Sequence, residues 1–156
     1  MAIVKKLDLS ESLGMALMLT TKSLEKLADL KMKNELGLTS SQWKVILALN
    51  FSDGMTQKDL AGKIYSDGST LVLVIDKMVE NGLVERRTDP DDRRNNRIYL
   101  TKKAGSVVDS IIDIVFEIRK LAYKGITENE IKSVRFVLDK IIENSDNAIN
   151  KKQNGR

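Results

Sequence analysis

Apolar residues recur every three or four positions through most of the chain, which is the spacing of one face of an α-helix. In the first half of the chain this pattern predicts four helices, over residues 9–36, 40–49, 57–64 and 69–81. From residue 102 it predicts a long helix to residue 122 and another that begins at residue 128. The chain is therefore expected to be mainly helical.

Several predicted helix ends fall at residues whose chemistry favours a boundary. Thr39 and Gln42 stand three positions apart, as do Thr127 and Glu130, so each pair can form a capping box that satisfies free backbone N–H groups. Thr56 can cap the short helix that follows it. Glycines able to adopt the left-handed conformation follow two of the predicted helices, at Gly37 and Gly82.

Two short stretches, residues 83–86 and 96–100, break the helical pattern and have the composition of β-strands. They flank a turn that holds Pro90, the only proline in the chain. A helix, a tight turn, a second helix and a hairpin follow one another in the order of a winged helix-turn-helix. The expected fold is mainly α with a small β-hairpin: a winged helix-turn-helix flanked by N- and C-terminal helices.

Positive charge is concentrated around this hairpin. Between Arg86 and Lys103 there are seven basic and three acidic residues, a net charge of +4, which equals the net charge of the whole chain. Such a local surface favours binding to a polyanion, and double-stranded DNA is the expected partner. Two alternatives remain: the arginines only keep an exposed hairpin hydrated, or the winged helix is a protein-interaction module without DNA binding.

The residue types that most enzymes use are missing. The chain has no cysteine and no histidine, which removes thiolate and imidazole metal ligands, cysteine nucleophiles and the commonest general base. Asp91 and Asp92 stand among arginines that would neutralise them, and no phosphate-binding glycine loop is present. We therefore expect no enzymatic activity, no cofactor and no metal. No apolar stretch approaches the length of a membrane span or signal peptide, so a cytoplasmic protein without membrane contact is expected.

Four segments resemble the MarR (multiple antibiotic resistance regulator) family, most specifically the D-x-R wing motif followed by L-T-x-x-G. These segments are Thr56-Gln57-Lys58-Asp59-Leu60-Ala61, residues 76–86, Asp89-Pro90-Asp91-Asp92-Arg93-Arg94, and Leu100-Thr101-Lys102-Lys103-Ala104-Gly105. The resemblance implies a homodimeric transcriptional regulator that binds a pseudo-palindromic operator, here expected to be a repressor. It also implies release from DNA by a small phenolic or amphipathic ligand.

On this interpretation the chain has four parts. They are an N-terminal dimerisation helix (1–36), the winged helix-turn-helix (37–102), C-terminal dimerisation helices (103–148) and a disordered tail (149–156). The first and third parts carry more apolar surface than a small winged helix can cover, which independently favours a second copy as partner.

The candidate DNA-contacting residues belong to a helix start, the recognition helix and the wing. They are Thr56, Gln57 and Lys58; Ser69, Thr70, Leu73 and Lys77; and Arg86, Arg87, Arg93, Arg94 and Arg97. The resemblance implies that Asp92 pairs with Arg94 and orients it for a narrow minor groove. Residues 71–75 are five consecutive aliphatic residues, which one side of a helix cannot bury, so Val72 and Leu73 are expected to face outward.

A ligand cavity is a further candidate. Met15, Met18 and Trp43 could line it between the dimerisation helices and the winged helix. The alternative is that these three residues are ordinary core, as such residues at helical spacing more often are.

Overall fold

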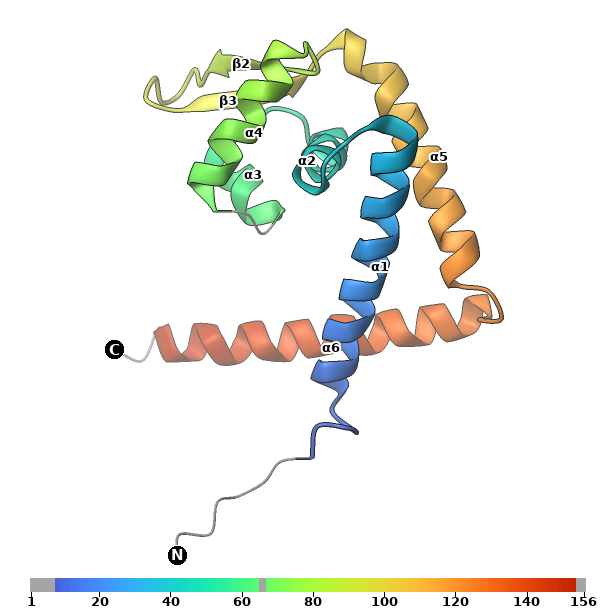
Figure 1. Ribbon diagram of the computed structural model, residues 1–156. Helices are drawn as coiled ribbons and strands as arrows, with labels where there is room; N and C mark the ends of the chain where they lie inside the picture. The colour runs from blue at the N-terminus through green and yellow to red at the C-terminus, as the bar shows by residue number, and fades with distance from the viewer. Residues whose placement is uncertain (1–7, 65–66, 154–156) are drawn as a thin grey trace, which may run out of the picture. The chain divides into compact units, whose positions relative to one another are not determined.

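The structure is a computed structural model that describes residues 8–64 and 67–153, and the chain divides into two compact units after Ile118 (Figure 1). The first unit contains α1 (Leu13–Leu36), α2 (Ser40–Phe51), β1 (Met55–Thr56), α3 (Gln57–Lys63), α4 (Gly68–Glu80), β2 (Val84–Thr88), β3 (Asn96–Leu100), a 3-10 turn (Lys102–Ala104) and most of α5 (Gly105–Ala122). The second contains the end of α5 and α6 (Glu128–Gln153).

The predicted helix boundaries are confirmed where local side chains set them. In the capping box at α2, Thr39 Oγ1 accepts from the N–H of Gln42 at 3.4 Å, and Gln42 Oε1 accepts from the N–H of Thr39 at 3.0 Å. Thr127 and Glu130 form the same exchange at the start of α6. Glycines with φ of +66° and +70° follow α1 and α4, at Gly37 and Gly82.

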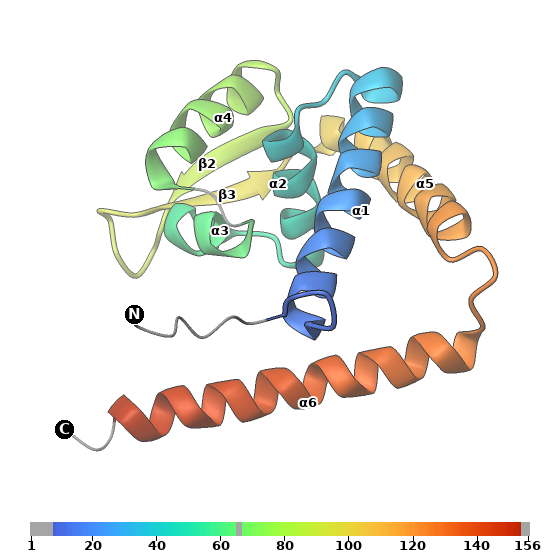
Figure 2. The same cartoon turned by 60° about the horizontal axis from the view of Figure 1, so that its bottom comes forward.

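The hairpin is part of a three-stranded antiparallel sheet with the order β1-β3-β2. In β2 and β3, Arg86 pairs with Ile98 and Arg87 with Arg97, while Thr56 of β1 pairs with Arg97 from the other side. The sequence did not predict β1, because two residues are too few for an alternating pattern. Helix α4 packs on β2 and α2 packs on β3 (Figure 2).

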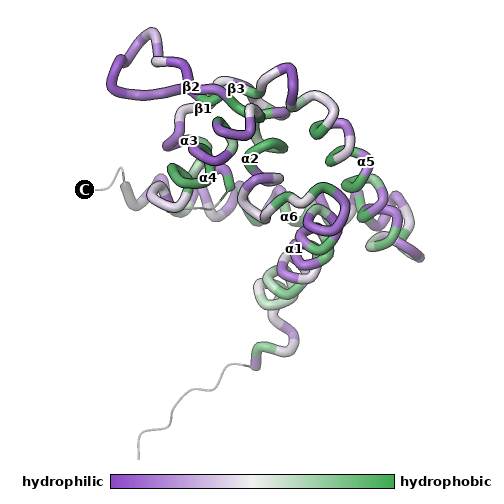
Figure 3. The backbone as a smooth tube through the Cα atoms, turned by 45° about the horizontal axis from the view of Figure 1, so that its top comes forward, coloured by the Kyte–Doolittle hydropathy of each residue, from purple (hydrophilic) through white to green (hydrophobic). Residues whose placement is uncertain are grey.

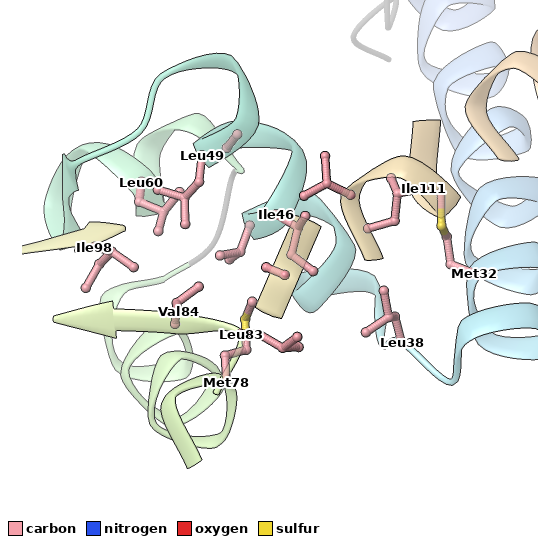
Figure 4. Close-up of a cluster of buried hydrophobic side chains, with 14 of the residues drawn as sticks. Met32, Leu38, Ile46, Leu49, Leu60, Met78, Leu83, Val84, Ile98 and Ile111 are labelled. Atoms are coloured by element: carbon pink, nitrogen blue, oxygen red, sulfur yellow. The ribbon is translucent and has the colours of Figure 1, made fainter. Parts of the chain in front are cut away.

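One aliphatic core holds these elements together (Figure 4). Its largest fully buried side chains come from every α-helix of the first unit and from both long strands: Met32, Val45, Ile46, Leu49, Leu60, Leu71, Ile75, Met78, Val84, Ile98 and Ile111. Burial of each such side chain contributes about 1.5–3 kcal/mol of transfer free energy. The core therefore fixes the position of α3, α4 and the hairpin in one domain.

Two expectations differ from the structure. Residues 149–153, predicted to begin a disordered tail, continue α6 as helix, because neither Gly nor Pro interrupts the chain between Glu128 and Gln153. Helix α4 begins at Gly68, one residue before its predicted start; residues 65–66 and 154–156, the last three of the predicted tail, lie outside the described residues. Among the helices of the described ranges, none is both long and apolar enough to cross a membrane.

Candidate nucleic-acid interface

Helix α4 has one face in the core and one face in solvent. Leu71, Ile75 and Met78 are fully buried, whereas Val72 is 40% and Leu73 is 72% exposed. The prediction that these two aliphatic side chains face outward is confirmed. Because these side chains are exposed, this face of α4 is accessible for contact with another molecule.

Asp67, which is not among the predicted site residues, organises the exposed start of α4. Its carboxylate accepts from the N–H of Thr70 at 2.8 Å, from Ser69 Oγ at 2.6 Å and from Thr70 Oγ1 at 2.7 Å. The Ser69 hydroxyl and then the two Thr70 donors lower the pKa of Asp67 to about 2. The sequence feature that indicates this cap is an aspartate three residues before Thr70, which is the usual spacing of an N-cap residue and the N–H group it accepts from.

Helix α3 presents a capped N-terminus. Thr56 Oγ1 accepts from the N–H of Asp59 at 3.1 Å and donates to the Asp59 carboxylate at 2.7 Å. Gln57 is half-buried and Lys58 is exposed. Lys77 is exposed in the last turn of α4, eight residues from Ser69 and hence about 12 Å further along the helix.

Three of the five predicted wing arginines lie in the strands of the hairpin, and each has a carboxylate partner. Arg86 Nη2 lies 2.6 Å from Asp76 of α4, and Arg97 Nε lies 2.8 Å from Asp89. Arg87 Nε donates to Glu85 at 2.8 Å, and its guanidinium lies over the ring of Tyr99, 4.3 Å from the centroid. The structure therefore gives these arginines intramolecular roles that a charge count does not reveal.

The other two arginines lie at the exposed tip of the hairpin, which is strongly hydrophilic (Figure 3). The side chain of Arg94 is 91% exposed, and its Nε donates to Asp92 at 3.1 Å. The predicted pairing of Asp92 with Arg94 is present, and the Arg94 guanidinium lowers the pKa of Asp92. Arg93 is exposed, and no described residue forms an ion pair with it. The exposed face of α4 thus lies beside a hairpin that carries two exposed arginines at its tip. These features define a winged helix-turn-helix domain of the kind that binds double-stranded DNA.

Comparison with known proteins supports this class and gives the family. The model of the MarR family matches residues 38–95. The uncharacterized HTH-type transcriptional regulator YsmB of Bacillus subtilis (strain 168) is 30% identical over 129 residues, which cover 72% of this chain and 88% of YsmB. The chain belongs to the MarR family. It is a DNA-binding transcriptional regulator, and its membership of a regulator family agrees with the expectation that it is not an enzyme.

Solved structures share the fold. A MarR family transcriptional regulator from Silicibacter pomeroyi is 24% identical with a TM-score of 0.78, covering 90% of this chain and 96% of that one. A cysteine-to-serine mutant of MarR from E. coli, solved in complex with operator DNA, is 22% identical with a TM-score of 0.72, covering 84% and 94%. No comparison supports the alternative of an interaction module without DNA binding.

A cavity of about 320 Å³ lies beside Trp43, between α2, the end of α3 and α1. Its lining is mainly apolar and aromatic, with charged side chains at its rim: Glu25, Trp43, Lys44, Leu47, Ala48, Phe51, Lys63 and Ile64. Trp43 Nε1 donates to Asp29 at 2.7 Å, which places the indole at the middle of α1. The structure does not bring Met15 and Met18 to this cavity, because they precede Asp29 on α1 by about 21 and 16 Å.

No cluster of three or more potential metal ligands occurs among residues 8–64 and 67–153. Every buried side-chain N or O atom of the described residues has a hydrogen-bond partner.

Proposed function

We propose that the protein is a homodimeric repressor that binds a pseudo-palindromic operator, with α4 in the major groove and the wing in the adjacent minor groove. The observation that carries this proposal is the wing tip, where Asp92 holds an almost fully exposed Arg94 in the same domain as the outward face of α4. A planar, permanently charged guanidinium suits a narrow groove of negative potential. Action on DNA supports the cytoplasmic localisation expected from the sequence.

Base recognition by α4 would come from Ser69, Thr70 and the aliphatic side chains of Val72 and Leu73. Apolar side chains can contact thymine methyl groups, but they discriminate less than a bidentate hydrogen-bonded pair. Lys58 beside the start of α3, together with Arg93, would contact phosphates. We therefore infer that phosphate and wing contacts supply most of the affinity.

The dimer is proposed from the apolar face of α6. Its members recur at helical spacing, and five of them expose between 39% and 57% of their surface: Val134, Val137, Ile141, Ile142 and Ile149. Helix α1 also exposes large apolar side chains, at Leu13, Met18, Leu19 and Leu30. Exposed apolar surface of this kind on each helix favours association with a second copy. A two-fold dimer would place its two α4 helices about 34–36 Å apart, one turn of DNA.

A mobility-shift titration with the DNA upstream of the protein's own coding sequence tests this function. We expect binding whose affinity falls by about 10³-fold or more between 50 and 200 mM salt, because several phosphate contacts release counterions. An unrelated duplex of equal length should bind at least about 10³-fold more weakly. Absence of binding at low salt, or equal binding to both duplexes, would contradict the proposal.

We also propose that the cavity beside Trp43 binds a small aromatic anion as effector. Lys63 Nζ lies over the exposed ring of Phe51, 5.2 Å from its centroid, and Lys44 Nζ lies 5.6 Å from that of Trp43. An aromatic ligand could lie against these rings while its carboxylate approaches Lys63. Because Lys63 belongs to α3, such a ligand would contact the DNA-binding domain directly.

Titration with 2-hydroxybenzoate, a phenolic carboxylate, tests the cavity through the fluorescence of Trp43, the only tryptophan in the chain. We expect saturable quenching, and weaker operator binding once the cavity is filled. The Lys63→Gln variant should need several-fold more ligand for half-maximal quenching, since a cation at the rim is lost. Unaltered fluorescence at millimolar ligand, or equal affinity in the variant, would count against this assignment.

A further inference from the structure

A buried carboxylate lies at the root of the wing, where β2 passes into the loop. Asp89 is only 4% exposed. Its Oδ2 lies 2.8 Å from Arg97 Nε, and its Oδ1 accepts from the N–H of Asp91 at 2.9 Å. Burying a carboxylate costs free energy unless charged and hydrogen-bonded partners compensate. The position of Asp89 therefore depends on Arg97.

The same guanidinium reaches a segment far away in the sequence. Arg97 Nη1 donates to the carbonyl oxygen of Gly54 at 3.1 Å, across 43 positions. Gly54 donates in turn to the carbonyl of Ile98 at 3.0 Å, and the Asp53 carboxylate accepts from the N–H of Leu100 at 2.9 Å. These hydrogen bonds hold the turn before β1 against β3.

This turn leads directly into the helix-turn-helix. Residues 55–56 form β1, and α3 begins at the next residue. Gly54 has a φ of +74°, and a Cβ added there would lie 2.6 Å from Cε1 of Tyr99, so the turn lies closely against the wing. One guanidinium therefore joins the root of the wing loop to the segment that enters α3.

We infer that Arg97 is a positioning residue, which together with Asp89 and Gly54 fixes the wing relative to α3 and α4 so that Arg94 reaches the minor groove. On this inference it acts within the protein and does not contact phosphate itself, although the sequence places it among the candidate DNA-contacting residues. Its side chain is only 34% exposed, and both of its described contacts are intramolecular. This inference rests on the proposed role of the wing.

Two substitutions that change the local charge in opposite directions show whether Arg97 positions the wing or binds phosphate. Arg97→Gln removes a positive charge and Asp89→Asn removes a negative one. If Arg97 contacts phosphate, Asp89→Asn should strengthen DNA binding or leave it unchanged. If the pair positions the wing, both variants should weaken operator binding by a similar factor, of the order of tenfold, the size expected for loss of a groove contact.

The salt dependence gives a second readout. When Arg94 is already alanine, we expect Arg97→Gln to leave the slope of log K against log salt unchanged, since no further cation contact to DNA is lost. The matched control Arg93→Gln should lower the slope by about one per subunit. The Arg97→Lys variant keeps the charge but cannot reproduce the two-sided contact of a guanidinium, and it should bind as weakly as Arg97→Gln.

A double-mutant cycle with Arg94→Ala completes the test. Arg94→Ala should cost little further affinity in the Arg97→Gln or Asp89→Asn backgrounds, because Arg94 is already misplaced there. A purely structural role would lower the melting temperature but leave the effect of Arg94→Ala intact, which would overturn the inference. Full operator affinity in Arg97→Lys would overturn the inference as well. Because a lysine at this position still gives the Asp89 carboxylate a positive partner, Arg97→Lys keeps the test valid even if the other two variants do not fold. If Arg94→Ala does not change operator binding in the otherwise unaltered protein, both the proposed role of the wing and this inference are refuted. If Arg94→Ala weakens binding equally with and without Arg97, only this inference is refuted.

Discussion

Replacing Ile141 of α6 with aspartate is expected to separate the proposed dimer into monomers and to weaken operator binding by about 10²–10⁴-fold. Ile141 lies within the exposed apolar face of α6, one turn from Val137. A carboxylate at this position would have to be desolvated at an apolar contact between copies, which is strongly unfavourable. A monomer engages one half-site only, and the gain from simultaneous engagement of two half-sites is lost. Sedimentation measures the first effect and a mobility shift the second.

The matched control is Asn150→Asp, which adds the same charge to the same helix. Asn150 follows Ile141 by nine residues, so at 100° per residue it lies on the opposite side of α6. This variant should remain dimeric and bind the operator with nearly unaltered affinity. A dimeric Ile141→Asp protein, or a monomer that binds DNA as tightly as the unaltered protein, would refute the proposed interface.

Arg94→Ala is expected to cost about 1–3 kcal/mol of operator binding for each wing, the range found for loss of a specific groove contact. The structure supplies two reasons. The Arg94 side chain is 91% exposed at the tip of the hairpin, and its partner Asp92 accepts hydrogen bonds from both its Nε and its backbone N–H. Pre-orientation of this kind lowers the entropy lost when the side chain enters a groove.

Arg93→Ala is the control, because it removes an equal charge from the adjacent position of the same loop. Both variants should reduce the salt dependence of binding. Only Arg94→Ala should also abolish the preference for A·T pairs at the outer flanks of the operator, where a narrow minor groove attracts arginine. Identical losses on A·T-rich and G·C-rich flanks would show that Arg94 acts through charge alone.

The sequence was most informative where structure is determined by near neighbours. The two capping boxes, the glycine stops after α1 and α4 and the outward position of Val72 and Leu73 all depend on spacings within one or two helical turns. The pairing of Asp92 with Arg94 spans two residues and is equally local. Patterns of this range can be read directly from the chain.

Contacts between distant residues could not be predicted in this way. Strand β1 is only two residues long and exists because β3 pairs with it more than 40 positions later. The ion pairs of Arg86 with Asp76 and of Arg97 with Asp89 join residues that a charge count along the chain cannot place beside one another. The cavity at Trp43 depends on the packing of three helices, so its lining differed from the one expected.

The two faces of α4 have a consequence for how regulators of this kind diverge. Leu71, Ile75 and Met78 hold the helix in the core, whereas Val72 and Leu73 contribute little to it. Exposed positions of this sort usually tolerate substitution within about 0.5 kcal/mol of folding free energy. After a gene duplication, one copy could therefore acquire a new operator through changes at two side chains while its fold stayed the same.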